Sequence, residues 1–230
     1  MDTLQNALQG VKSRITDAAV VAGRNPRDIL LLAVSKTFPA ARIREAFAAG
    51  QSHFGENYLQ EAIDKMADLT DLPITWHFIG PVQSNKTRLI AERFAWVHSV
   101  DRIKIADRLS AQRPATLRPL QVCIQVNTSG ETSKSGCAPN DVVALARSIA
   151  GMKGLMLRGL MSVPEPTPHI HLRQSQFESL ARLLERCVDA GIAMDTLSMG
   201  MSQDLEQAIA AGATIVRIGT AIFGERPISD

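Results

Sequence analysis

Short, continuous runs of apolar residues recur along the chain, and polar segments separate them. The first run covers residues 29–34 and reads Ile-Leu-Leu-Leu-Ala-Val. Runs of this length and composition are typical of parallel strands that helices cover on both faces. The pattern predicts eight strands, over residues 29–34, 52–54, 74–79, 96–98, 120–126, 155–161, 196–198 and 215–218.

Between these runs the apolar residues are spaced three and four apart, as on one face of an amphipathic helix. The spacing predicts an opening helix over 2–22 and further helices over 40–49, 57–68, 84–93, 101–112, 140–150, 173–190 and 203–211. Alternating strands and helices imply a parallel sheet, and eight such units close into a barrel. The expected fold is therefore α/β: a single (β/α)8 TIM-like barrel over 1–230, with the extra N-terminal helix packed on it.

Composition excludes several classes of function. The net charge is only +2 and the basic residues are scattered, while aromatic residues make up 4% of the chain, so we expect no nucleic-acid partner. No apolar stretch approaches the roughly 18 residues of a membrane span, so we expect no membrane partner. Cys123, Cys137 and Cys187 are odd in number and widely spaced, which favours a reducing compartment and a cytoplasmic protein.

Lys36 is the first candidate for chemistry. Active sites of such barrels lie at the carboxyl ends of the strands, and Lys36 follows the first strand almost directly. Partial burial lowers the pKa of an amine, and a neutral amine condenses with an aldehyde to a Schiff base. A surface lysine at the start of a loop remains the alternative interpretation at this point.

A second candidate site combines the ends of the last two strands. Ser198-Met199-Gly200-Met201-Ser202 follows the seventh strand, and we expect Ser202 to cap the helix that begins at 203. Arg217-Ile218-Gly219-Thr220 ends the eighth strand, where Gly219 permits close backbone approach. Barrels often hold a phosphate at these two strand ends. An ordinary helix cap and an ordinary tight turn are the alternatives.

A Schiff-base lysine and a phosphate site at neighbouring strand ends together suggest one ligand, pyridoxal 5'-phosphate (PLP). This cofactor carries its aldehyde and its phosphate on one ring. Arg217 could reach the ring nitrogen, and an always-protonated guanidinium would keep that nitrogen unprotonated and the cofactor a weak electron sink.

Several long motifs resemble the pyridoxal phosphate homeostasis protein family over essentially the whole chain. They are Leu32-Ala33-Val34-Ser35-Lys36, Phe54-Gly55-Glu56-Asn57-Tyr58, Trp76-His77-Phe78-Ile79-Gly80, Gln83-Ser84-Asn85-Lys86, Lys134-Ser135-Gly136, Leu157-Arg158-Gly159-Leu160-Met161, Ser198-Met199-Gly200-Met201-Ser202 and Val216-Arg217-Ile218-Gly219-Thr220-Ala221-Ile222-Phe223-Gly224. The resemblance implies a close bacterial member with a fold like the N-terminal barrel of alanine racemase, fold type III among PLP proteins.

The resemblance also implies roles for individual residues. Lys36 would be the Schiff-base residue, Arg217 would face the pyridine nitrogen, and Asn57 and His77 would line the pocket at the mouths of strands two and three. The phosphate would contact Ser202, Gly219 and Thr220, and the cofactor-binding set also includes Met199 and Gly200. The family has no firmly established turnover and is understood to bind, buffer or deliver PLP, so no catalytic residue is assigned. Apo forms of PLP-dependent enzymes are the expected transient partners.

Two other functions remain open. One is a PLP-dependent amino-acid racemase, and the other is a Schiff-base aldolase acting on a sugar phosphate. A racemase of this fold needs a second domain that supplies a catalytic tyrosine across a dimer; here the chain ends at Asp230 and its only tyrosine is Tyr58. We therefore expect a monomer without a second catalytic base.

The remaining candidates are weaker. Lys134 either meets the ligand or is an exposed loop lysine, and both interpretations stand. His169 and His171 lie in a Pro-rich loop without acidic or cysteine neighbours, so we expect no metal site. His53 and His98 lie on predicted strands and are expected to be hydrogen-bonded core histidines.

Overall fold

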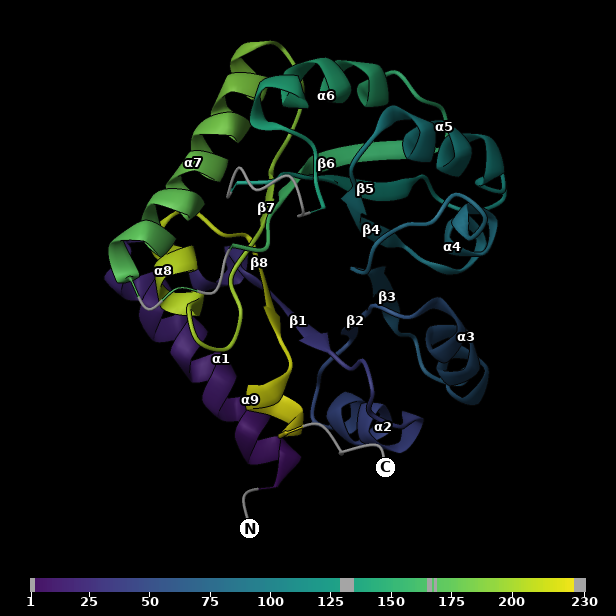
Figure 1. Ribbon diagram of the computed structural model, residues 1–230. Helices are drawn as coiled ribbons and strands as arrows, with labels where there is room; N and C mark the ends of the chain where they lie inside the picture. Colours follow the sequence, from purple (N-terminus) through teal and green to yellow (C-terminus); the bar gives the residue numbers. More distant parts are fainter. Residues whose placement is uncertain (1–2, 129–134, 165–166, 168, 226–230) are drawn as a thin grey trace.

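The structure is a computed structural model that describes residues 3–128, 135–164, 167 and 169–225. Eight parallel strands form a closed barrel in chain order, and β8 pairs with β1 to close it (Figure 1). The strands are β1 (Leu30–Val34), β2 (His53–Glu56), β3 (Thr75–Phe78), β4 (Trp96–Val100), β5 (Leu120–Gln125), β6 (Leu155–Met161), β7 (Thr196–Ser198) and β8 (Ile215–Ile218). The predicted barrel and the place of all eight strands are confirmed.

The helices surround the barrel. They are α1 (Leu4–Val21), α2 (Ala40–Ala48), α3 (Leu59–Asp68), α4 (Thr87–Arg93), α5 (Ile103–Gln112), α6 (Val142–Ala150), α7 (Ile170–Asp189), α8 (Leu205–Ala210) and α9 (Thr220–Phe223), with short 3-10 turns η1 (Pro26–Asp28) and η2 (Pro139–Asp141). None of the described helices is long and apolar enough to cross a membrane.

Several helices begin at other residues than predicted, and one helix was not predicted. Helix α4, predicted from residue 84, begins at Thr87. Helix α7 begins at Ile170 instead of 173, and α8 begins at Leu205 instead of 203. Helix α9 follows β8 and was not predicted, because its four residues are too few to show a helical period. The shift at α8 matters for the site, because it removes Ser202 from the capping position.

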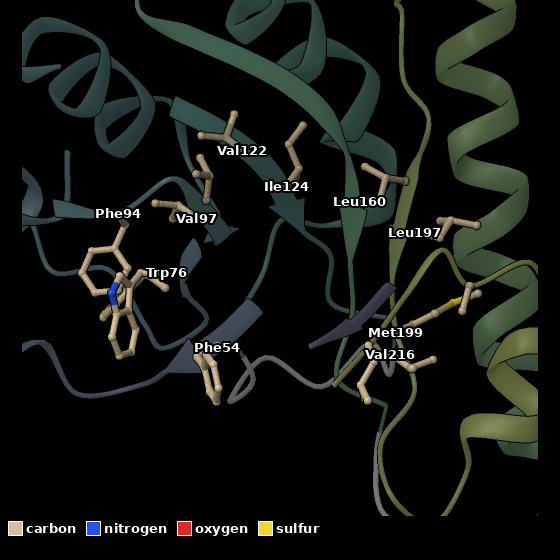
Figure 2. Close-up of a cluster of buried hydrophobic side chains, with 14 of the residues drawn as sticks. Phe54, Trp76, Phe94, Val97, Val122, Ile124, Leu160, Leu197, Met199 and Val216 are labelled. Carbon is tan, nitrogen blue, oxygen red and sulfur yellow. The ribbon is translucent and has the colours of Figure 1, made fainter. Parts of the chain in front are cut away.

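The apolar core lies mainly between the strands and the helices. Figure 2 shows side chains of this layer, among them Phe54, Trp76, Val97 and Leu197, all of which are buried. Alternate strand residues point the other way, into the barrel. The interior apolar cluster is smaller and contains Leu32, Trp96, Cys123, Met161 and Ile215. Most of the remaining interior positions are polar, and they form part of the site.

Helix α1 packs along the outside of the barrel, past α8 and α9 (Figure 1). Its buried face consists of Leu4, Leu8, Val11, Ile15 and Ala19. Arg14 donates from Nη2 to the carbonyl oxygen of Ser202 at 3.1 Å and from Nε to Glu206 at 2.9 Å. The N-terminal helix thus contacts the loop that was predicted to bind phosphate.

Candidate functional site

Lys36 lies in a tight turn directly after β1 and is partly buried. The amide of Phe38 donates to the carbonyl oxygen of Ser35 at 3.1 Å, which closes a four-residue turn with Lys36 and Thr37 at its centre. Thr37 has a φ of +69°, and it is the only non-glycine residue with positive φ in the described part of the chain. A β-branched residue rarely adopts this conformation, so the turn that carries Lys36 is strained.

A buried ionic cluster lies beside this turn, between the strands and α3. It contains Ser35, Glu56, Glu61 and Lys65, and we call it the Lys65 cluster. Lys65 donates from Nζ to the Ser35 carbonyl oxygen at 2.8 Å, to Glu56 Oε1 at 2.8 Å and to Glu61 Oε1 at 2.5 Å. These three acceptors use all three donors of the ammonium group. The Ser35 hydroxyl also donates to Glu56 Oε1, at 2.6 Å.

The cluster holds the backbone on both sides of Lys36. Lys65 binds the carbonyl oxygen of Ser35, and Glu61 Oε1 accepts a hydrogen bond from the amide of Thr37 at 2.5 Å. The Glu56 side chain is fully buried, and its Oε2 has no hydrogen-bond partner among the described residues. Burial raises the pKa of Glu56, and the ammonium of Lys65 opposes that rise.

A second polar network crosses the barrel interior. His53 Nδ1 lies 3.0 Å from His77 Nε2, and His77 Nδ1 lies 2.9 Å from His98 Nε2. His98 Nδ1 lies 2.8 Å from Ser198 Oγ, which accepts from Arg217 Nη1 at 2.9 Å. We call these five residues the histidine column; it connects strands β2, β3, β4, β7 and β8.

Arg217 sets the direction of the column's hydrogen bonds. A guanidinium only donates, so the Ser198 hydroxyl accepts from it and is oriented to donate onward to His98 Nδ1. Burial, and then the charge of Arg217, lower the pKa of His98 to about 3. Burial also lowers the pKa of His77 well below its ordinary value and the pKa of His53 below it. The three imidazoles are therefore neutral at pH 7.

Arg217 keeps its charge although it is buried. Burial lowers its pKa to about 10, which still leaves it protonated at neutral pH. Its guanidinium donates to the Ser198 carbonyl oxygen at 2.5 Å and to the Ser162 carbonyl oxygen at 2.8 Å, besides Ser198 Oγ. Two of its five N–H groups make no hydrogen bond among the described residues. A buried cation with spare donors is suited to a ligand atom that accepts.

The two predicted phosphate segments meet in space. The amide of Ala221 donates to Ser202 Oγ at 3.4 Å, so the loop after β7 touches the first turn of α9. The prediction that Ser202 caps the next helix is wrong: Asp204 occupies that position, and its side chain accepts from the amide of Met201 at 2.6 Å. We call Ser202, Gly219 and Thr220, with the backbone around them, the phosphate cup.

Two glycines allow the backbone of the phosphate cup to pack closely against neighbouring residues. A Cβ on Gly219 would lie 3.2 Å from the carbonyl oxygen of Val34, two residues before Lys36. Gly200 has a φ of +95°, and a Cβ there would lie 2.5 Å from that of Ala208. Met199, in the loop before the cup, is buried in the apolar layer between the strands and the helices (Figure 2). The cup therefore lies directly beside the strand that leads to Lys36, and side chains larger than glycine would disturb it.

Within the part of the chain that the structure describes, three buried oxygens near the carboxyl ends of other strands lack hydrogen-bond partners. They are Asn57 Oδ1 after β2, Thr128 Oγ1 after β5 and Ser162 Oγ after β6. A buried polar atom without a partner is costly, so such atoms usually mark a place for water or a ligand. The mouth of the barrel thus combines an amine, a buried cation, a backbone cup and unpaired oxygens, a donor and acceptor set that fits PLP.

The remaining predicted residues are five histidines and Lys134. His77 lies one residue before the end of β3, is fully buried and has both ring nitrogens hydrogen-bonded, so it lies below the mouth; its contact with a ligand stays a prediction. His98 is a hydrogen-bonded core residue as expected, and His53 is half-buried. Lys134 lies outside the described residues. Within those residues no group of three metal-ligating side chains occurs; His169 is the N-cap residue of α7 and His171 belongs to that helix.

Sequence reasoning missed Ser162 and the Lys65 cluster, and it gave Ser198 no role of its own although it identified the segment that Ser198 begins. The two serines end or follow a strand, so the rule that identified Lys36 would also have identified them. Lys65 gave a subtler signal, because it occupies the buried face of an amphipathic helix where an apolar residue is expected.

Comparisons with known proteins agree with this geometry. Residues 16–227 match the family model of the alanine racemase N-terminal domain. The pyridoxal phosphate homeostasis protein of Pseudomonas aeruginosa is 62% identical over 98% of this chain and 97% of its own length. That of Escherichia coli is 51% identical over 100% of this chain and 99% of its own.

Solved structures of similar proteins also include a PLP-binding relative and alanine racemases. PipY of Synechococcus elongatus, in a structure with PLP bound, is 39% identical with a TM-score of 0.81, covering 91% of this chain and all of that chain. Alanine racemase of Clostridium difficile has a TM-score of 0.79 at 13% identity and covers all of this chain, which covers 58% of the racemase. The racemase shares the barrel fold, and its low identity supports nothing further.

Proposed function

The chain belongs to the alanine racemase N-terminal domain family and, within it, to the pyridoxal phosphate homeostasis proteins, and on that premise we propose its function. It binds PLP and takes part in the homeostasis of that cofactor. The observation that carries the proposal is the convergence of Lys36, the phosphate cup and Arg217 at one end of the barrel. The racemase and aldolase alternatives have no comparable support.

Each residue has a distinct task in this proposal. When bound, PLP supplies an aldehyde that condenses with an amine and a ring that withdraws electrons. Lys36 attaches the cofactor through its amine nitrogen, with loss of the aldehyde oxygen as water. Arg217 donates a hydrogen bond to the ring nitrogen without protonating it. The other cofactor-binding residues we propose are Asn57, His77, Met199, Gly200, Ser202, Gly219 and Thr220.

Lys36→Ala tests the attachment. The full-length variant should lose the yellow, borohydride-fixable chromophore while the cup retains weak, noncovalent PLP. Lys104→Ala, which changes an exposed lysine on α5, is the matched control and should keep the chromophore. Peptide mapping after borohydride reduction locates the attachment. An unchanged chromophore in Lys36→Ala would move the site elsewhere, with Lys134 the first residue to examine, and a colourless wild type would restore the aldolase.

We further propose that the protein has no enzyme-like turnover. Racemisation needs a proton taken from one face of the substrate carbon and another delivered to the opposite face. Tyr58, the only phenol, is 55% exposed and directly precedes α3. Loaded protein incubated with each L-amino acid in deuterated water should show no inversion on the scale of about 1–10³ per second. Fast inversion with deuterium at Cα would favour the racemase.

The proposal also covers the compartment, the oligomeric state and the partners of the protein. We place the protein in the cytoplasm, in keeping with three unpaired cysteines, and expect a monomer that passes PLP transiently to apo forms of PLP-dependent enzymes. A timed transfer assay from loaded protein to a purified apoenzyme tests delivery: transfer faster than spontaneous release of PLP supports it, and equal rates argue for buffering alone. A stable dimer in light scattering at micromolar concentration would contradict the monomer.

A further inference from the structure

The turn that carries Lys36 has an unusual composition. A turn with positive φ at its third residue normally places glycine there, because glycine has no Cβ to clash. Here that residue is Thr37, with φ +69°, and eight glycines have positive φ elsewhere in the described chain. A threonine in this position persists only when its surroundings hold it. The structure therefore needs a restraint at Thr37.

Glu61 supplies the restraint. Its Oε1 lies 2.5 Å from the amide nitrogen of Thr37 and accepts that hydrogen bond. The same oxygen lies 2.5 Å from Lys65 Nζ, one helical turn further along α3, and Lys65 in turn binds the carbonyl oxygen of Ser35. The two peptide groups that flank Lys36 are thereby tied to one ion pair on one helix.

The Lys65 cluster would be an energetically costly way merely to pack α3 against the sheet. Lys65 is only 7% exposed at its side chain, and an apolar residue of similar volume would join α3 to the sheet without the desolvation penalty of a buried charge. Among the described hydrogen bonds, the side chains of the cluster contact backbone groups only at residues 35 and 37. Both observations connect the ion pair to the conformation of Lys36.

We propose that Glu61 is a positioning residue for Lys36, held in place by Lys65, and that it keeps the strained turn in the one conformation that aims the amine at the cofactor. This inference rests on the proposed function, in which Lys36 is the attachment residue. Glu61 acts through the backbone and touches no ligand. Loss of the restraint should let the turn relax and misplace the amine, without weakening the phosphate cup.

The test measures attachment in two stages. Full-length apo protein is mixed with PLP at several concentrations, and the absorbance of the lysine-linked chromophore is followed by stopped flow. The concentration of half-saturation reports noncovalent binding at the cup, and the plateau rate reports attack by Lys36. Glu61→Ala should lower the plateau rate about 10- to 100-fold, the range expected for a misplaced reacting group, with half-saturation unchanged. Glu61→Gln keeps an acceptor oxygen for the Thr37 amide and should retain most of the rate.

A second substitution separates positioning from simple structural damage. Thr37→Gly removes the strain, so in the Glu61→Ala background it should restore at least half of the lost rate on a logarithmic scale. Glu45→Ala removes an exposed carboxylate that pairs with Arg42 on α2, and as the matched control it should leave the rate unchanged. Thermal unfolding of each variant confirms that it is folded.

The outcomes are distinct. A Glu61→Ala rate equal to that of Glu45→Ala overturns the inference, and so does a slow rate that Thr37→Gly leaves slow. A wild type that forms no borohydride-fixable link at Lys36 refutes the proposed function itself and the inference with it. A wild type that attaches PLP normally while Glu61→Ala does so slowly, with rescue by Thr37→Gly, supports both.

Discussion

Two buried polar networks lie close to the barrel mouth, the histidine column inside the barrel and the Lys65 cluster outside it, against α3. The column has one cation, Arg217, which donates to two carbonyl oxygens and one hydroxyl oxygen. The column's three imidazoles are neutral and carry no balancing charge. The cluster pairs its cation, Lys65, with two carboxylates. The difference fits the two proposed roles. A cation proposed to face a ligand needs spare donors, whereas a cation proposed to fix backbone can be fully neutralised.

The two networks therefore respond differently to substitution and to pH. In the column, burial disfavours the charged form of each histidine. In the cluster, burial disfavours the charged form of Glu56, against the attraction of Lys65. One network titrates by gaining positive charge in acid, and the other by losing a proton as the pH rises.

The largest expected effect comes from breaking the cluster at its centre. Lys65→Met leaves Glu56 buried without its cation, which should cost about 3–5 kcal/mol of unfolding free energy at pH 8, measured by urea denaturation. Replacing both partners, with Glu56→Leu and Lys65→Met together, removes the unpaired charge and should recover most of that loss. The exposed Lys104→Met is the control. A double variant as unstable as the single one would show that the cluster is not a charge-balanced unit.

Acid should weaken the column next. The folded-state pKa of His98, about 3, lies below the ordinary 6.5. The contribution of neutral His98 to stability is therefore present above pH 6.5 and is lost as the pH falls from 6.5 towards the folded-state pKa. The loss is about 1.4 kcal/mol per pH unit for each histidine that stays neutral, or about 2 kcal/mol each between pH 6.5 and 5.

A variant isolates that contribution. His98→Gln cannot titrate, so the difference in unfolding free energy between pH 7.5 and pH 5 should shrink by about 2 kcal/mol, whatever the variant's stability at pH 7.5. Urea denaturation at the two pH values measures it. An unchanged difference would mean that His98 is protonated in the folded protein at pH 5.

These contrasts also show which features a sequence can predict. The barrel was predictable because β1 is a run of apolar residues and strands buried on both faces leave that signature. The position of Lys36 at the barrel mouth was predictable because it follows from where β1 ends, while its role stays a prediction. The column was not, since His53, His77 and His98 meet only through the register and stagger of three strands. The positive φ of Thr37 was not predictable either, because threonine disfavours it and only the contact with Glu61, 24 residues away, holds it.

A smaller effect of the opposite sign should come from Glu56. Its folded-state pKa is raised above the ordinary 4.5, so it contributes stability below pH 4.5 that is lost as the pH rises through the folded-state value. Glu56→Gln should remove that loss, with a difference in slope of at most about 1.4 kcal/mol per pH unit. Urea denaturation of both proteins from pH 4.5 upward measures the difference. Parallel curves for variant and wild type would show that Glu56 has an ordinary pKa.

The last comparison takes one serine from each network, and the smaller effect is expected for Ser35. Ser198→Ala removes the hydroxyl between Arg217 and His98 and leaves His98 Nδ1 buried without a donor, which should cost about 1–3 kcal/mol. Arg217 keeps two carbonyl acceptors, so the cost should be constant between pH 7 and 9, where the histidines are neutral. Ser35→Ala removes one donor to Glu56, which keeps Lys65, and should cost about 1 kcal/mol at neutral pH.

The pH dependence of the two serine variants completes the comparison. The Ser35 hydroxyl favours the charged form of Glu56, so its removal raises the pKa of that carboxyl further. The destabilisation by Ser35→Ala should therefore grow as the pH rises from 4.5, because the folded protein holds its proton longer while the unfolded chain ionises. For Ser198→Ala it should not grow with pH. Urea denaturation of both variants and of wild type from pH 4.5 to 9 measures this. If both serine variants gave the same pH profile, the two networks would not differ in how they carry charge. The reason is that removing a hydroxyl has a pH-dependent cost only where that hydroxyl stabilises the ionised form of a carboxyl group, as Ser35 does for Glu56.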